Sequence, residues 1–201
     1  MQSAAGKIVI ASGNAGKLRE IARILGEFNI TVVPQSDFGV VDIEETGGSF
    51  LENALIKARH AASATGLPAI ADDSGLAVDA LDGRPGIYSA RYSGPDADAE
   101  KNIDKLLEEL EGVPDGQRGA VFRCVACYVT PDKSEPIIAE GMWRGLILRE
   151  RQGDGGFGYD PVFFDLELGR SSSQMSAEEK NSRSHRGQAL QELARQLRDL
   201  Q

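Results

Sequence analysis

Hydrophobic and polar positions alternate along the first part of the chain in a way that predicts a strand, a tight turn and a helix. Residues 7–12 form a short apolar run that is β-branched at its centre and ends at Gly13, which indicates a buried strand. From Lys17 onward the period changes to that of a helix. The apolar positions of one helical face are Leu18, Ile21, Ala22, Leu25 and Phe28. This succession is typical of the start of an α/β unit.

Further strands and helices follow in the first half of the chain. Residues 31–34 are expected to form a second strand, and the capping-box spacing of Ser49-Phe-Leu-Glu52 predicts the start of a helix. A short strand over residues 68–71 is expected to end abruptly at Asp72. The alternation of apolar positions across residues 76–80 then predicts a separate strand.

The second half of the chain combines long strands with charged helices. Residues 119–130 and 136–148 are expected to form two long strands, antiparallel neighbours joined by a turn. Helices are predicted over residues 97–110, after the capping box Ser176-Ala-Glu-Glu179, and over residues 189–200 with Ser184 as a fitting N-cap.

Composition and charge narrow the possible partners. The chain has 201 residues, a formal net charge of −9 and ordinary apolar content, which suits one soluble domain or two closely joined lobes. Because so acidic a surface repels long polyanions, no nucleic acid partner is expected, whereas a small anion can still bind a local cluster of cations. No apolar run approaches the ~20 residues that span a bilayer. We therefore expect no membrane association and a cytoplasmic protein.

The two cysteines, Cys124 and Cys127, have CxxC spacing inside a predicted strand. Positions three apart in a strand face opposite ways, with Cα atoms roughly 10 Å apart, too far for a disulfide. A structural role is expected for both.

A first candidate site is Ser12-Gly-Asn-Ala-Gly-Lys17, where a strand turns into a helix. Unpaired N–H groups and the positive end of the dipole favour anions there, the glycines allow close approach, and Lys17 adds a full charge. The segment is not a Walker A loop, because Ala11 and Leu18 stand where that motif requires Gly and Ser or Thr. Phosphate binding and a plain capped helix start remain equal alternatives.

A second candidate site is acidic and comprises Glu44, Glu45, Asp72 and Asp73. Asp72 and Asp73 follow an apolar strand, where α/β sheets place ligands, and only one of two adjacent strand residues is expected to enter a site. Carboxylates that converge on a triphosphate need a cation, and Mg²⁺ is the usual one. A solvated acidic loop is the alternative.

Two further segments carry aromatic and cationic groups. In the glycine-rich loop 153–161, Phe157 and Tyr159 could stack on a base and Asp160 could bind its edge; a β-bulge with both rings in the core is the alternative. Lys180, His185 and Arg186 lie at or between helix starts, where the dipole disfavours cations, which suggests an acceptor-rich ligand. His60, in mid-helix, is expected at the surface.

Taken together and in this order, these segments resemble the inosine/xanthosine triphosphate pyrophosphatase family, of the bacterial dITP/XTP type. The similarity covers nearly the whole chain, and the one visible departure is Ser12, where Thr is more usual. The matching stretches are Ser12-Gly-Asn-Ala-Gly-Lys17, Glu44-Glu-Thr-Gly47 through Glu52-Asn-Ala54, Ala71-Asp-Asp-Ser-Gly-Leu76, Gly83-Arg-Pro-Gly-Ile-Tyr-Ser-Ala-Arg91, Gly155-Gly-Phe-Gly-Tyr-Asp-Pro161 and Ser184-His-Arg-Gly187.

The resemblance implies an α/β fold: a long curved mixed sheet flanked by helices, in two lobes with the active site in the cleft between them. It implies that residues 1–201 form a single nucleotide pyrophosphatase domain and that the protein is a homodimer. The implied reaction is Mg²⁺-dependent hydrolysis of non-standard purine nucleoside triphosphates (ITP, dITP and XTP) to the monophosphate and pyrophosphate, which cleanses the nucleotide pool.

Residue roles carried over by position follow from the same resemblance. Glu45 binds the metal, with Glu44 as an adjacent candidate, and Asp73 binds metal and orients or deprotonates the attacking water. The substrate-binding residues are Ser12, Gly13, Asn14, Ala15, Gly16 and Lys17 for the triphosphate, Ser74, and Phe157, Gly158, Tyr159, Asp160, Lys180, His185 and Arg186 for the nucleoside. Arg84 and Arg91 receive no role.

Two other functional classes compete with this interpretation. A non-catalytic nucleotide sensor keeps the glycine turn and the nucleoside contacts but has no need of the carboxylates. A P-loop kinase is disfavoured by the failed Walker spacing. Release of pyrophosphate from ITP separates all three.

Overall fold

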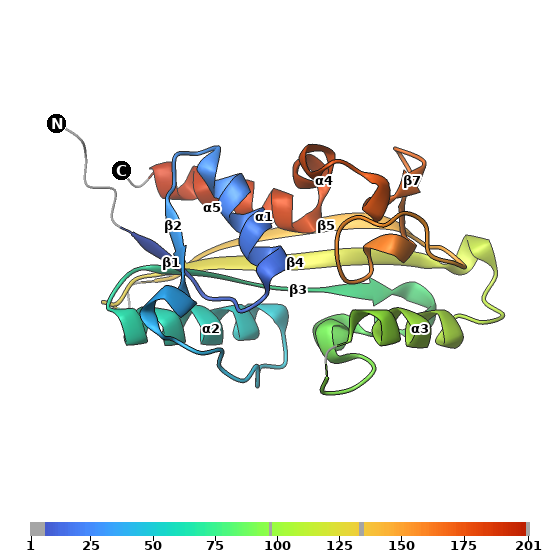
Figure 1. The fold of residues 1–201 in the computed structure, drawn as a ribbon, viewed down its shortest axis with the longest axis horizontal. Helices are drawn as coiled ribbons and strands as arrows, with labels where there is room; N and C mark the ends of the chain where they lie inside the picture. The colour runs from blue at the N-terminus through green and yellow to red at the C-terminus, as the bar shows by residue number, and fades with distance from the viewer. Residues whose placement is uncertain (1–6, 97, 133–134, 200–201) are drawn as a thin grey trace. The chain divides into compact units, whose positions relative to one another are not determined.

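The computed structural model describes residues 7–96, 98–132 and 135–199. Its strands are β1 (Ile8–Ile10), β2 (Val32–Pro34), β3 (Ala69–Val78), β4 (Gly119–Val129), β5 (Ile137–Ile147), β6 (Phe163–Asp165) and β7 (Arg170–Ser171). Its α-helices are α1 (Ala15–Gly26), α2 (Phe50–Thr65), α3 (Ala99–Glu109), α4 (Ala177–Arg183) and α5 (His185–Asp199) (Figure 1).

The strands form one mixed sheet. Over the described residues it has seven strands in the order β2-β1-β3-β4-β5-β6-β7. β1 is parallel to β2 and β3, whereas β6 is antiparallel to β5 and β7. The predicted fold class, an α/β mixed sheet flanked by helices, is confirmed, and so is the pairing of the two long strands as neighbours. The single two-lobed domain with a cleft stays a prediction.

The chain divides into two compact units, and β3, β4 and β5 each contribute to both. Residues 7–73, 124–141 and 186–199 belong to the first unit, as far as it is described. There α2 covers one face of the strands, and α1 and α5 cover the other (Figure 1). The second unit, residues 74–123 and 142–185, packs α3 against a core that contains Phe122, Trp143 and Phe163.

The alternation of side chains along β3 decides where the acidic residues face. Ala69 and Ala71 pack against α2, whereas Ile70 packs in the core with α1 and α5. With a period of two, Asp72 continues the face of Ile70 and Asp73 that of Ala71. The prediction of separate strands before and after these residues was wrong, because one strand runs from Ala69 to Val78. Ion pairs on both faces hold the aspartates within it.

Several local predictions are confirmed. The Ser49 side chain caps α2 by accepting from Glu52 N, and Ser176 with Glu179 forms a capping box at α4. Cys124 and Cys127 are free and lie in the two different cores of the first unit, on opposite faces of β4. Residue 97 and Leu200, the outer ends of two predicted helices, lie outside the described residues. No helix in the described part of the chain is long and apolar enough to cross a membrane.

Candidate active site

The turn between β1 and α1 is organised by Asn14. Its Oδ1 accepts hydrogen bonds from Gly16 N and Lys17 N at 2.9 and 3.0 Å, and Ser12 Oγ accepts from Asn14 N at 3.2 Å. The carboxylate of Asp42, an exposed side chain, lies close to Gly13, so that a Cβ at Gly13 would require this carboxylate to move. The segment is therefore a capped helix start, and that cap fixes the first turn of α1, which carries the Lys17 side chain.

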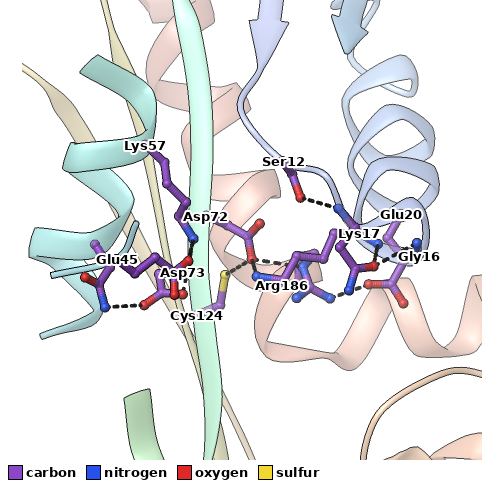
Figure 2. A network of polar contacts seen from close by, with 12 residues as sticks. Ser12, Gly16, Lys17, Glu20, Glu45, Lys57, Asp72, Asp73, Cys124 and Arg186 are labelled. Carbon is purple, nitrogen blue, oxygen red and sulfur yellow. Dashed lines mark hydrogen bonds and ion pairs between the residues drawn. The ribbon is translucent and has the colours of Figure 1, made fainter. Parts of the chain in front are cut away.

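Lys17 belongs to an ionic network centred on Asp72. Lys17 Nζ lies 3.2 Å from Asp72 Oδ2, and Arg186 Nε, from the first turn of α5, donates to the same oxygen at 3.2 Å (Figure 2). Arg186 also pairs with Glu20 of α1. Residues far apart in the sequence thus converge beside the N-terminus of α1, within the first unit.

Asp72 is buried and charged. Burial alone would raise its pKa, but Lys17 and Arg186 outweigh burial and hold the pKa of Asp72 well below its ordinary value. Its second oxygen, Oδ1, is buried and has no hydrogen-bond partner among the residues that the structure describes. Cys124 Sγ lies 3.8 Å from Oδ2. Burial and this carboxylate raise the pKa of the Cys124 thiol far above neutrality, so the cysteine is inert.

Asp73 belongs to a second group on the other side of β3 (Figure 2). Lys57 Nζ, from α2, lies 2.6 Å from Glu45 Oε1 and 3.3 Å from Asp73 Oδ1. Asn53, one helical turn earlier, donates from Nδ2 to Asp73 Oδ2 at 3.2 Å and accepts from Gly47 N at 2.8 Å. Asn53 therefore ties the loop that carries Glu45 to the strand that carries Asp73.

The electrostatics of this second group suit proton transfer. Burial raises the pKa of Asp73, which Lys57 lowers only in part. For Lys57, burial lowers the pKa, but Asp73, Asp72 and Glu45 outweigh it, and the net shift is upward. A carboxylate with a raised pKa is a stronger base toward a water proton. Glu44, adjacent to Glu45, is exposed and takes no part in this group's ion pairs.

This second group offers a divalent cation two carboxylates, those of Glu45 and Asp73. Within residues 7–96, 98–132 and 135–199, no cluster of three or more Asp, Glu, His or Cys side chains is arranged to hold a metal. Glu45 and Asp73 nevertheless share one cation, the Lys57 ammonium. Two carboxylates around a shared positive charge fit Mg²⁺, which is usually held by one or two carboxylates plus waters and phosphate oxygens.

The glycine-rich loop of the second unit is built around Asp160. Its Oδ2 accepts from Lys180 Nζ at 2.6 Å and from Phe157 N at 2.8 Å, and its Oδ1 accepts from Ser172 Oγ at 2.8 Å. Lys180 Nζ also lies 4.7 Å from the centroid of the Phe157 ring. A buried aspartate thus positions both a half-buried aromatic ring and a cation.

The two aromatic residues of this loop lie in different environments. Tyr159 is in the core of the second unit, where its hydroxyl donates to Ser89 O at 2.9 Å, whereas Phe157 is half-buried. Gly158 has φ 59°, a conformation that favours glycine. His185 stacks on Phe122 with ring centroids 4.6 Å apart and an interplanar angle of 8°. Ser74, next to Asp73 in β3, is half-buried.

Sequence reasoning assigned no individual role to Lys57, Asn53 or Glu20. The signal that could have found two of them is their spacing: Asn53 and Lys57 are four apart in a predicted helix and so share one face. Their partner Asp73 lies on a strand, and no local pattern shows which strand residue a helix face meets. Arg84, left without a role, pairs with Glu109 at 2.6 Å.

Comparison with known proteins places this geometry in context. The profile of the Ham1 family matches residues 8–196. The chain is 57% identical over 194 residues to a dITP/XTP pyrophosphatase of Shigella flexneri, covering 96% of this chain and 98% of the relative. It is 58% identical over 192 residues to a dITP/XTP pyrophosphatase of Thioalkalivibrio sulfidiphilus, covering 95% and 98%.

Solved structures show the same likeness. A HAM1 protein from Coxiella burnetii is 47% identical, with a TM-score of 0.87 over 96% of this chain and 98% of that one. A structure from Mycobacterium abscessus, described as nucleoside-triphosphatase / dITP/XTP pyrophosphatase, is 42% identical, with a TM-score of 0.72 over 97% and 98%.

Proposed function

We propose that this chain, which belongs to the Ham1 family, hydrolyses non-standard purine nucleoside triphosphates such as dITP, ITP and XTP to the monophosphate and pyrophosphate. The observation that carries the proposal is the buried carboxylate of Asp73, with its raised pKa, beside Glu45 and a shared cation. The full-length identity to dITP/XTP pyrophosphatases supports the choice of substrate.

The residues divide the reaction between them. Mg²⁺, when bound, neutralises phosphate charge and polarises the bond that breaks. Glu45 and Asp73 are the residues that would hold it. Asp73 orients the attacking water and accepts its proton as oxygen bonds to the α phosphorus. The bond to the bridging oxygen breaks, and pyrophosphate leaves with its charge stabilised by Lys17 and the N-terminus of α1.

The nucleoside contacts are proposed for the second unit's residues and for Arg186. Phe157 offers a ring face to a purine, and Lys180 and His185 offer N–H donors to an acceptor-rich edge. The contacts of Asp160 with Lys180 and Phe157 support a positioning role for Asp160 rather than direct base contact. Ser74 and residues 12–17 complete the proposed substrate contacts.

One assay tests the reaction. The protein is incubated with XTP, ITP or dITP and Mg²⁺ in ¹⁸O-labelled water, and products are separated by mass. Attack at the α phosphorus puts the label in the monophosphate, and attack at the β phosphorus puts it in pyrophosphate. A sensor releases no product, and a kinase gives a diphosphate only with an acceptor. Label in pyrophosphate, or no turnover, would overturn the proposal.

The metal assignment has a matched pair of variants in adjacent residues. Glu45→Gln removes a carboxylate that shares a cation with Asp73, whereas Glu44→Gln removes an exposed one. We expect Glu45→Gln to raise the Mg²⁺ concentration for half-maximal activity on the order of tenfold or more and Glu44→Gln to leave it near the parent value. The reverse order would assign the ligand to Glu44.

The homodimer remains a proposal that rests on the family resemblance, and the cytoplasmic location one that rests on the lack of a long apolar run in the sequence. Sedimentation equilibrium of the full chain distinguishes a dimer from a monomer directly.

A further inference from the structure

Lys57 stands where a metal ion is expected. Its Nζ lies 2.6 Å from Glu45 Oε1 and 3.3 Å from Asp73 Oδ1, the two carboxylates assigned above to Mg²⁺. The side chains of Lys57, Glu45 and Asp73 are 13%, 24% and 6% exposed. We propose that Lys57 is a positioning residue that holds these carboxylates together in the metal-free protein and competes with the metal for them. The inference rests on the proposed function, because that function supplies the metal.

The spacing of Asn53 and Lys57 along α2 explains how a metal could replace Lys57 without disturbing the rest of the site. Asn53 and Lys57 are one helical turn apart and face the same carboxylate. Asn53 donates to Asp73 Oδ2 and Lys57 to Asp73 Oδ1, so each oxygen has its own donor. A cation that binds Asp73 through Oδ1 displaces only the lysine. The Asn53 contact, together with its bond to Gly47 N, keeps the loop that carries Glu45 attached.

The charge balance of the group indicates whether replacing Lys57 strengthens or weakens metal binding. Two carboxylates and one ammonium have a net charge of −1, and replacing Lys57 by a neutral residue leaves −2. Carboxylates this poorly exposed repel each other when their shared cation is removed. In the variant, a divalent metal ion relieves this repulsion when it binds, and it has no ammonium group to displace. Removal of Lys57 therefore strengthens metal binding, whereas removal of a simple structural contact weakens it by loosening the site.

The experiment measures Mn²⁺ binding to the full-length protein without nucleotide, by the loss of the free Mn²⁺ signal in electron paramagnetic resonance. Lys57→Met is expected to lower the dissociation constant on the order of tenfold, and Lys57→Arg, which keeps the charge, to stay close to the parent. Lys101→Met is the charge-matched control, since Lys101 is 64% exposed and pairs only loosely with Asp98 at 3.5 Å. Equal or weaker Mn²⁺ binding by Lys57→Met overturns the proposal.

Thermal unfolding provides a second readout if Lys57→Met folds poorly. In EDTA the variant is expected to melt below the parent, and Mn²⁺ is expected to raise its melting temperature by more than it raises that of the parent. An equal or smaller gain for the variant contradicts competition.

The two proposals fail in different ways. Asp73→Asn is expected to abolish the Mn²⁺ binding described above, and unchanged binding in that variant removes the metal site and the Lys57 proposal with it. If Mn²⁺ binding follows the expected order but the parent releases no pyrophosphate from XTP, the proposed function fails and the competition stands.

Discussion

Asp72 and Asp73 are neighbours in β3, yet their carboxylates join two separate groups of charges on opposite faces of the strand. Asp72 pairs with Lys17 and Arg186, and Asp73 with Lys57 and Asn53. Because successive side chains of a strand point to opposite faces, two adjacent residues can belong to two different groups of charges. The first group lies beside the proposed phosphate loop, and the second forms the proposed metal and water site.

Asp73→Asn keeps the shape of the side chain but removes its charge. We expect kcat to fall on the order of 100-fold or more, because metal binding and base catalysis both depend on the carboxylate. Steady-state pyrophosphate release measures the loss, and circular dichroism confirms the fold. Asp104→Asn, at a side chain 68% exposed, is the control. Near-parental turnover of folded Asp73→Asn protein would remove Asp73 from the mechanism.

Lys17→Ala separates phosphate binding from pairing with Asp72. Because Lys17 is only 17% exposed and its partner is fully buried, the variant is expected to lose stability as well as activity. Adding Asp72→Asn removes the carboxylate left short of a partner. The double variant should regain part of the stability, of order 1 kcal/mol, but none of the activity on XTP.

Urea unfolding and kcat/KM, measured on both single variants and the double variant, complete that cycle. If the double variant regains activity together with stability, Lys17 serves only to neutralise Asp72, and the helix start is a capped helix and nothing more.

Two adjacent glycines test the loop that carries Glu45. A Cβ at Gly47 would lie 2.6 Å from Glu52 Cβ and 2.7 Å from Asn53 Oδ1, closer than real contacts allow, whereas a Cβ at Gly48 would meet Glu52 Oε2 at an ordinary 3.5 Å. Gly47→Ala must displace the loop and is expected to weaken Mg²⁺ activation on the order of tenfold. Gly48→Ala should behave as the parent. Equal Mg²⁺ titration curves for the two variants would show that the loop need not be fixed.

The sequence predicted which helices and strands exist better than it predicted where the strand β3 begins and ends. Capping boxes and apolar periodicity identified α2, α4 and the long strands, because these signals are local. The same logic broke β3 in two, since acidic residues and a glycine in Asp72-Asp-Ser-Gly75 are typical of a loop. Cations of α1, α2 and α5, from segments distant in the sequence, pair with the two aspartates and so favour a strand at this stretch.

Some residues of the candidate site could likewise be predicted from local motifs, and others could not. The positions of Lys17, Asp73 and Asp160 were predictable from motifs. Lys57 was not, because a lysine in a charged helix is usually solvated, and its burial depends on the strand against which α2 packs. Nor did the motif show that Asp160 binds Lys180, since that contact joins residues 20 apart in sequence.

Asp165 makes a pH-dependent contribution to stability. Burial would raise its pKa, but the N–H groups of Leu168, Trp143 and Glu167 and the Arg183 guanidinium outweigh it and lower the pKa below the ordinary 3.8. A group whose folded pKa is depressed stabilises the fold above its unfolded pKa, and the contribution is lost as pH falls through the folded value. Asp165→Asn should cost about 2 kcal/mol at pH 7 and progressively less below about pH 4.

Urea unfolding at pH 7 and below about pH 4 measures how much stability Asp165→Asn loses under each condition. The unfolding is monitored by the fluorescence of Trp143, the single tryptophan. Trp143 Nε1 donates to Asp165 at 2.7 Å and so reports on the site itself. A penalty that does not change with pH would show that the charge of Asp165 has no part in stability.

Base selectivity follows from the donors of the second unit. Hypoxanthine and xanthine carry an oxygen at position six, an acceptor, where adenine carries an amino group. Lys180 is a donor only, and a histidine ring has at least one N–H. With ATP these donors meet another donor, at a cost of about 1–3 kcal/mol per buried group, and sites of this kind can discriminate on the order of 10⁴-fold. We therefore expect kcat/KM for ITP and XTP to exceed that for ATP by a large factor, and His185→Ala and Lys180→Met to reduce this ratio of specificity constants.

Arg186→Ala is expected to reduce the ratio as well, but it also breaks the ion pairs with Asp72 and Glu20, so it lowers activity on every nucleotide. GTP shares the six-oxygen, and these donors give no reason for its exclusion. Competition kinetics with ITP, XTP, ATP and GTP decide the matter, because equal specificity constants for ITP and ATP in the parent protein would rule out a donor edge.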